Sequence, residues 1–203
     1  MSRNWSLILV VAFALGFGLK SYLDHQSQVT PTSDGRDASI LYGEQGQPVD
    51  IFDSSDPRIR VVYFGFTRCP DVCPTSLAML AGALNQVGEE VQHQFRPMFI
   101  SLDPERDAAA DAHRYAQYFH PSIEGLSAPL EITTPLAHRY GVIFRKTELE
   151  NSELGYTLDH SSYFYFLAPN GTLLTKVPHT LTPAPIVEAL NTVTKQPQQT
   201  DKK

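Results

Sequence analysis

The sequence predicts an α/β domain in which a central sheet is flanked by helices. Two mainly apolar runs, at 60–66 and 97–102, are typical of strands buried on both faces of a sheet. Each run precedes a segment with helical periodicity, and strands that alternate with helices indicate parallel pairing. Two later apolar runs flank Asn170-Gly171, a dipeptide that favours a tight hairpin turn and adds antiparallel strands. That order has the form of a thioredoxin-like domain.

The individual elements follow from the spacing of apolar residues and from start and stop signals. Leu77, Leu80 and Leu84 recur on one face of a helix. Pro74 fits the first position of that helix, because proline lacks the N–H that is unpaired there. In chain order we expect strand 60–66, helix 74–87, strand 97–102, helix 107–119, helix 134–140, strand 142–146, hairpin strands 163–167 and 172–177, and helix 183–194.

The two ends of the chain are expected to lie outside this domain. The run at 4–19 is apolar and uncharged, which predicts an uncleaved transmembrane helix, so we assign a membrane anchor to 1–23. A cleaved signal peptide is the alternative, but no small-x-small cleavage site follows the apolar run. We interpret 24–38 as a flexible polar tether, 39–194 as the domain and 195–203 as a disordered tail.

Charge predicts the orientation of this anchor and excludes one class of partner. Arg3 precedes the apolar run, while Lys20 after it is soon offset by Asp24, which favours a cytoplasmic N-terminus. We therefore expect a single-pass protein of the inner (cytoplasmic) membrane of a bacterium, with its C-terminal domain in the oxidising periplasm. The net charge of −6 and the lack of a basic run argue against binding to nucleic acid.

The two cysteines of the chain, Cys69 and Cys73, lie between a predicted strand and a predicted helix. Their close spacing indicates a metal site, a redox pair or a small structural disulfide. The partial positive charge at a helix N-terminus favours the thiolate, which is the form that binds metal and attacks disulfides. Two thiolates select soft metals such as Cu(I), and the same spacing permits a disulfide, so both states stay open.

A histidine could supply a further metal ligand. The candidates are His25, His93, His113, His120, His138, His160 and His179. The four on or beside predicted helices, from His93 to His138, are expected to be exposed polar residues. His160 stands out because it precedes the apolar run 163–167, and because Asp159 beside it is expected to orient the imidazole.

Other carboxylates have simpler interpretations. Asp103, Glu105 and Asp107 precede a predicted helix, so we interpret them as helix-start residues rather than catalytic groups. Asp71 lies between the cysteines. It either supports the site by tuning its charge or contacting a partner, or it is an exposed turn residue.

Three short segments carry a specific similarity. Residues 63–74 read YFGFTRCPDVCP, residues 101–107 read SLDPERD, and residues 159–161 read DHS. In this order they resemble the motifs of the Sco/SenC family, and the similarity extends over residues 40–190, approximately. The resemblance implies a thioredoxin-fold copper protein that helps to assemble the binuclear copper centre of cytochrome c oxidase.

The resemblance also implies which residues carry the chemistry. Cys69, Cys73 and His160 would bind one copper ion per chain, and Cys69 and Cys73 would form a redox-active disulfide. The implied partners are the copper-centre subunit of the oxidase, the membrane through the N-terminal helix, and a thiol reductase. Thus a metallochaperone is favoured over an enzyme, with a thiol-disulfide reductase or a redox sensor as the alternative. A peroxidase is disfavoured, because Phe66 stands where peroxiredoxins place Thr or Ser.

Overall fold

The computed structural model describes residues 39–150 and 152–195. The predicted anchor at 1–23, the predicted tether at 24–38 and all but the first residue of the predicted tail lie outside the described residues. Within the described part, no helix is long and apolar enough to cross a membrane.

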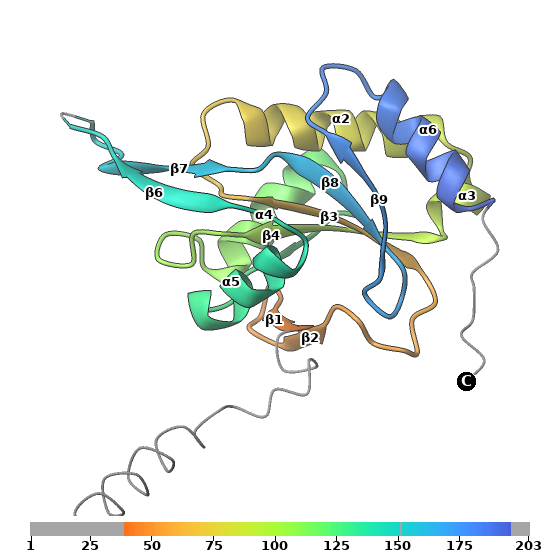
Figure 1. Cartoon of the computed structure of the whole chain (residues 1–203), viewed down its shortest axis with the longest axis horizontal. Helices are drawn as coiled ribbons and strands as arrows, with labels where there is room; N and C mark the ends of the chain where they lie inside the picture. Colours follow the sequence, from red (N-terminus) through yellow and green to blue (C-terminus); the bar gives the residue numbers. More distant parts are fainter. Residues whose placement is uncertain (1–38, 151, 196–203) are drawn as a thin grey trace, which may run out of the picture. The chain divides into compact units, whose positions relative to one another are not determined.

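A mixed five-stranded sheet forms the centre of the domain (Figure 1). In spatial order its strands are β5 (Glu124–Leu126), β4 (Phe95–Ser101), β3 (Ile59–Gly65), β8 (Tyr163–Leu167) and β9 (Leu173–Pro178). Strand β3 is parallel to β4 and antiparallel to β8, which confirms the predicted combination of parallel strands and a hairpin. Every residue of β3 is buried, as expected for an apolar run in the middle of a sheet.

Helices cover both faces of this sheet. They are α2 (Val72–Gln86), α3 (Glu89–Gln92), α4 (Ala109–Phe119), α5 (Leu130–Arg139) and α6 (Ala184–Val193). Helix α2 connects β3 to β4, and α4 connects β4 to β5. Both crossovers advance in the same direction across the sheet, and right-handed crossovers then place α2 and α4 on one face. Helix α2 packs against α4 and α6, while α5 lies on the other side of the sheet in Figure 1.

Aromatic side chains of the sheet alternate between its two faces. The ring of Tyr63 lies 5.1 Å from that of Phe164, on the face covered by α2. The ring centre of Phe64, the next residue, instead lies 5.8 Å from that of Tyr165. The ring centre of Tyr165 lies 6.1 Å from that of Tyr140, at the end of α5. Because successive strand residues point to opposite faces, this register places Tyr63 against the start of α2.

Two small hairpins lie outside the main sheet. Strand β1 (Ile40–Tyr42) pairs with β2 (Pro48–Asp50), and β6 (Phe144–Glu148) pairs with β7 (Tyr156–His160). In Figure 1 the β6–β7 hairpin projects beyond the main sheet. The sequence predicts none of β1, β2 and β7, because these strands are short and mostly exposed or only partly buried, and no buried face imposes a two-residue period on them.

The starts of several helices differ from the prediction, and two of these differences, in α2 and α5, involve a proline. Helix α2 begins at Val72, so Pro74 is its third residue rather than its first. N–H groups throughout the first turn lack an intrahelical acceptor, which is why proline is tolerated there as well. Helix α5 begins at Leu130 and contains Pro135, whereas the sequence predicts a start at residue 134. The shift in α2 moves Cys73 into the first turn of the helix.

The hairpin predicted between β8 and β9 is confirmed. Gly171 has a φ of 83°, in the left-handed region that glycine adopts without steric cost. The side chain of Asn170 accepts a hydrogen bond from the N–H of Thr172 over 3.0 Å. The strand predicted at 142–146 lies two residues later, as β6. The short elements α3 and β5 are not predicted.

Candidate metal centre

Cys69 and Cys73 lie on either side of the start of α2. The N–H of Cys73 donates a hydrogen bond to the Cys69 sulfur over 3.4 Å, and the N–H of Cys69 donates to the Phe66 carbonyl over 3.3 Å. Both cysteines are free thiols; Cys69 is partly buried and Cys73 fully buried. Asp71 occupies the N-cap position, is exposed, and makes no side-chain capping bond. The N–H groups of the first turn are therefore available to the Cys69 sulfur.

The carboxylate of Asp107 holds the loop that leads into Cys69. It accepts hydrogen bonds from the Thr67 N–H over 2.9 Å, the Thr67 hydroxyl over 2.5 Å and the Ser101 hydroxyl over 2.6 Å. Asp107 is fully buried, and the N-cap of α4 is Ala108 rather than a carboxylate. The interpretation of Asp107 as a helix-start residue is therefore wrong, because its oxygens join the ends of β3 and β4 instead.

The other carboxylates of the same loop hold the β6–β7 hairpin. Asp103 accepts hydrogen bonds from Arg106 over 2.5 Å and from the Tyr156 hydroxyl over 2.7 Å. Arg106 also donates to the carbonyls of Leu154 and Tyr156, and its guanidinium lies 3.5 Å from the centre of the Tyr156 ring. Glu105 pairs with Lys146 over 3.1 Å. Asp103 and Glu105 are thus not helix-start residues either; they fix the hairpin that carries His160.

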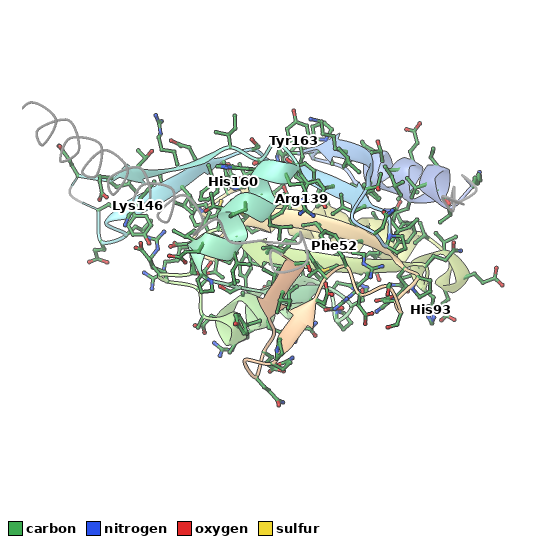
Figure 2. The ribbon with its side chains drawn as sticks, turned by 60° about the horizontal axis from the view of Figure 1, so that its bottom comes forward. Phe52, His93, Arg139, Lys146, His160 and Tyr163 are labelled. Atoms are coloured by element: carbon green, nitrogen blue, oxygen red, sulfur yellow. The ribbon has the colours of Figure 1, made fainter. Side chains whose placement is uncertain are left out.

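His160 is the last residue of β7 and contacts the cysteine pair. Its Nε2 lies 3.4 Å from the Cys73 sulfur, although 87 residues separate the two in the sequence. Its Nδ1 lies 3.2 Å from the Ser161 carbonyl oxygen. Since a carbonyl only accepts, we assign the proton to Nδ1, which leaves Nε2 of the neutral ring free to accept or to ligate. Figure 2 shows His160 and Lys146 toward one end of the domain and His93 toward the other.

Asp159 does not orient this imidazole. Its carboxylate accepts hydrogen bonds from the Thr147 hydroxyl over 2.7 Å and from Arg145 over 3.1 Å. These bonds, led by that from Thr147, hold the pKa of Asp159 below its usual value. The expectation that Asp159 orients His160 is wrong, because alternate strand residues point to opposite faces and the backbone carbonyl of Ser161 takes that role.

The two thiols differ in their protonation. A hydrogen bond from the Cys73 thiol lowers the pKa of Cys69 to about 4, and burial opposes this shift. The same bond between the cysteines raises the pKa of Cys73, together with burial and the negative charge on Cys69. The reduced site at neutral pH therefore holds a thiolate at Cys69 and a thiol at Cys73.

Comparison with known protein families shows to which family the chain belongs. The family model described as SCO1/SenC matches residues 40–195. This chain belongs to the SCO1/SenC family. The match extends through the fold and all three sequence motifs, so the family predicted from those motifs is confirmed.

Relatives and solved structures within the SCO1/SenC family agree with the thioredoxin-like fold. The mitochondrial protein SCO1 homolog 1 of Arabidopsis thaliana is 35% identical over 174 residues, which are 77% of this chain but 51% of that protein. This chain thus spans about half the length of that relative. The crystal structure of Arabidopsis ScoI with copper bound has a TM-score of 0.69 and 31% identity, and covers 77% of this chain and 96% of its own. Copper-bound ScoI of Bradyrhizobium japonicum has a TM-score of 0.64 and 32% identity. The match covers 75% of this chain and 95% of the ScoI chain.

The donor set of this SCO1/SenC chain fits a soft metal. In the described part of the chain, no group of three or more His, Cys, Asp or Glu side chains is already spaced to hold an ion. The Cys73 sulfur and His160 Nε2 are nevertheless 3.4 Å apart. Two tetrahedral ligands with metal bonds of about 2.3 Å to sulfur and 2.0 Å to nitrogen lie about 3.5 Å apart. A metal ion would replace the proton of the Cys73 thiol, and two sulfurs with one imidazole suit Cu(I).

The other described histidines lie away from this contact or face different partners. His93 and His138 are exposed, as predicted, and His113 is partly so. His120 is buried, contrary to the prediction, and its Nδ1 accepts a hydrogen bond from the N–H of Ser122 over 3.2 Å. His179 lies 2.8 Å from the Ser76 hydroxyl. His25 lies outside the described residues.

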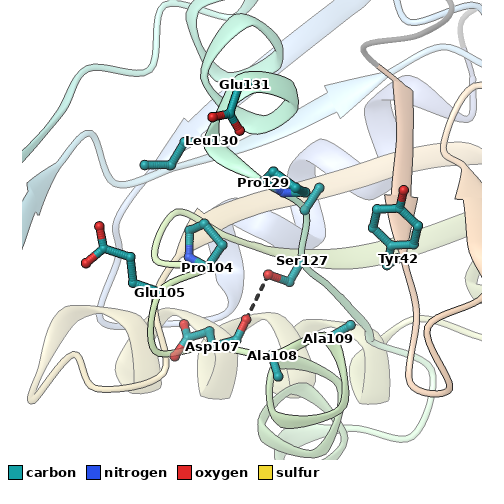
Figure 3. Close-up of a pocket in the computed structure, with 11 residues that line it drawn as sticks. Tyr42, Pro104, Glu105, Asp107, Ala108, Ala109, Ser127, Pro129, Leu130 and Glu131 are labelled. Carbon is teal, nitrogen blue, oxygen red and sulfur yellow. Dashed lines mark hydrogen bonds between the residues drawn. The ribbon is translucent and has the colours of Figure 1, made fainter.

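A pocket in the described part of the chain lies away from this centre (Figure 3). It encloses about 510 Å³ between the starts of α4 and α5, where Ser127 donates a hydrogen bond to the Asp107 carbonyl over 2.8 Å. Tyr42, Leu130 and nine other residues line it, and none of them is a cysteine or a histidine. The candidate metal centre lies outside this pocket, and the partly buried Cys69 connects it to the surface.

Two features of the centre are not predicted from the sequence. One is the Ser161 carbonyl that fixes the imidazole, because a backbone acceptor leaves no residue-type signal. The other is Tyr63, which is fully buried in β3 beside Cys73. Strand periodicity could have found Tyr63, since it shares a face of β3 with Gly65, next to the cysteine loop.

Proposed function

We propose that this chain binds one copper ion through Cys69, Cys73 and His160 and passes it to the binuclear copper centre of cytochrome c oxidase. The observation that carries the proposal is the 3.4 Å contact between the Cys73 sulfur and His160 Nε2. The fold brings these atoms together across 87 residues of sequence, at the one place in the described chain where both cysteines lie.

The chemistry of the site suits a copper ion that is transferred to another protein rather than bound permanently. Cys69 is partly exposed and already a thiolate, so it offers the first ligand to an incoming ion. Cys73 then loses its proton on binding, and Nε2 of His160 needs to lose none. With three protein ligands, one coordination position stays open for the exchange of ligands with an acceptor protein.

Family membership supports both the ion and the acceptor. The ScoI proteins of Arabidopsis and Bradyrhizobium, at 31% and 32% identity, have been crystallised with copper bound. We extend copper binding to this chain because it has the matching fold and the donor set. The oxidase subunit as acceptor rests on the family resemblance of the three motifs, and so does the supporting role of Asp71, which is exposed beside Cys69.

The location is part of the proposal. An uncleaved helix over 1–23 would anchor the chain in the inner membrane of a bacterium and hold the domain in the periplasm. Delivery of copper to an oxidase fits that location, because a flexible tether at 24–38 would leave the domain free to reach a membrane-bound partner.

The second candidate function is thiol-disulfide exchange, favoured by the unequal thiols. The Cys69 thiolate would attack a partner disulfide and form a mixed disulfide, and one partner sulfur would leave as thiolate. Cys73 would then lose its proton and attack the Cys69 sulfur, which releases the second partner sulfur and leaves the Cys69–Cys73 disulfide. This reaction would keep the cysteines of an oxidase copper site reduced, and a thiol reductase would restore the dithiol.

The variant His160→Ala separates the two functions. Copper binding needs the imidazole, so we expect the affinity for Cu(II) to fall by more than about tenfold and that for Cu(I) to fall less. Disulfide exchange needs only the sulfurs, so the dithiol–disulfide cycle should persist. In cells at limiting copper, a carrier with this change would fail to support oxidase assembly. The exposed His93→Ala is the matched control and should behave as the unaltered chain.

The opposite outcome selects the other function. If oxidase activity survives the His160→Ala change at limiting copper, delivery by this site is wrong and thiol maintenance takes its place.

A further inference from the structure

The hydroxyl of Tyr63 is a buried polar group without a hydrogen bond. Tyr63 is fully buried, and its Oη finds no partner within ordinary hydrogen-bond geometry. Among the described residues, the same is true of only two other side-chain atoms, Nη2 of Arg106 and the hydroxyl of Tyr115. A buried donor without an acceptor is costly, so its presence calls for a state of the protein in which the bond is made.

The Cys73 sulfur lies close to the Tyr63 ring. A Cβ placed on Gly65 would lie 3.0 Å from the Cys73 sulfur and 3.1 Å from the Tyr63 ring, so sulfur and ring adjoin over the bare backbone of this glycine. Both side chains are fully buried, with an exposed fraction of 0%.

The two other polar neighbours are the neutral hydroxyls of Ser76 and Ser162. The Ser76 hydroxyl lies 2.8 Å from Nδ1 of His179. The Ser162 hydroxyl donates to the His160 carbonyl over 3.5 Å. The sulfur of Cys73 is the acceptor whose strength increases when it loses its proton, since hydrogen bonds to charged acceptors are roughly twice as strong as neutral ones.

We propose that Tyr63 is a positioning residue whose hydroxyl donates a hydrogen bond to the Cys73 sulfur once that sulfur ligates a metal ion. The inference rests on the proposed copper site, which it extends by a second layer of contacts. Hydrogen bonds to a ligating sulfur withdraw electron density from it and tune the metal. Tyr63 thus moderates the thiolate of Cys73.

The test compares Tyr63→Phe with Tyr115→Phe in the purified full chain. Phenylalanine keeps the ring contact of Tyr63 with Phe164, and both changes remove one buried, unpartnered hydroxyl. With Cu(II) bound, Tyr63→Phe should shift the sulfur-to-copper charge-transfer absorption to longer wavelength. Its affinity for Cu(I), measured against a chromophoric chelator, should fall by about tenfold. Tyr115→Phe should match the unaltered chain in both measurements.

Repeating the Tyr63→Phe change in a Ser76→Ala variant identifies the group that accepts the hydrogen bond of the Tyr63 hydroxyl. In the presence of Ser76→Ala, the spectral shift caused by Tyr63→Phe should be unchanged if the acceptor is Cys73. A shift that vanishes in this background would assign the hydrogen bond to Ser76 and overturn the inference. So would equal spectra and affinities for Tyr63→Phe and the unaltered chain. Failure of the unaltered chain to bind copper would instead refute the proposed function, and this inference with it.

Discussion

At the scale of single residues, the centre depends on two thiols with different protonation. Cys69 accepts hydrogen bonds from the Cys73 thiol and from the N–H groups of Asp71 and Cys73, so its thiolate is stabilised. Cys73 is fully buried beside that negative charge and keeps its proton. One sulfur is therefore ready to bind or attack, and the other becomes active only when a metal ion or a neighbouring sulfur displaces its proton.

This difference predicts a selective reaction of the reduced protein with iodoacetamide. Because its pKa is lowered from 9.0 to about 4, Cys69 is a thiolate from weakly acidic pH upward. The rate of its alkylation should rise through about pH 4 and level off below neutrality, while Cys73 stays unmodified. Peptide mass spectrometry of briefly treated samples measures both rates. In the unfolded protein the two sites should react alike, with the pH dependence of ordinary thiols.

A half-maximal rate near pH 9 for Cys69 in the folded protein would contradict this difference between the two thiols, and so would equal rates at the two cysteines.

Prediction from the sequence succeeds for some of these residues and fails for others, for physical reasons. Spacing and helix position are sufficient to single out the cysteine pair. His160 is only modestly distinguished by its surroundings, and its assignment depends on the family resemblance, because no local pattern encodes a contact across 87 residues. Asp159 is predicted in the wrong role because sequence proximity ignores the alternation of a strand.

At the scale of elements, the centre is built where α2, the loop after β4 and the end of β7 meet. Asp107 joins the loop before α2 to the end of β4, through bonds to Thr67 and Ser101. Asp103 and Arg106 join the loop after β4 to β7. The acidic segment 101–107 therefore serves as a brace that sets the distance between the cysteines and His160.

Removal of this brace should destabilise the fold. Asp107→Ala leaves one N–H and two hydroxyls without their acceptor in a buried site, so we expect the free energy of unfolding to fall by about 2–4 kcal/mol. Urea denaturation of the full chain measures this change. Asp111→Ala is the matched control, because Asp111 is exposed and pairs only with Arg114. The control should change the free energy by less than about 1 kcal/mol.

Should Asp107→Ala and Asp111→Ala unfold at the same urea concentration, the bracing role of Asp107 would be wrong.

The elements that the sequence predicts correctly are those with a buried face. Strands β3, β4 and β8 and helix α2 are recovered because burial imposes an apolar run or a helical period. The β6–β7 hairpin is held instead by ion pairs and by the stacking of Arg106 and Lys146 on Tyr156. Such contacts leave no periodicity, so the strand that carries His160 is missed.

At the scale of the whole domain, the fold brings three separate motifs to one place. The order of strands and helices is enough to predict a thioredoxin-like sheet, because parallel pairing follows from alternation. It is not enough to predict how the loops close. Arg60, for example, lies in a predicted apolar strand, yet its buried guanidinium donates to the carbonyls of Ile51, Asp53, Asp56 and Arg58, which holds the loop before β3.

The central claim is that this whole arrangement holds one copper ion, and metal analysis tests it most directly. The purified chain is reduced, loaded anaerobically with excess Cu(I), freed of unbound metal and analysed for copper per chain. We expect about one ion for the unaltered chain, and a loss of tight binding in Cys69→Ser and in Cys73→Ser, because one thiolate with one imidazole holds Cu(I) poorly. Full copper content in either cysteine variant, or none in the unaltered chain, would contradict the account.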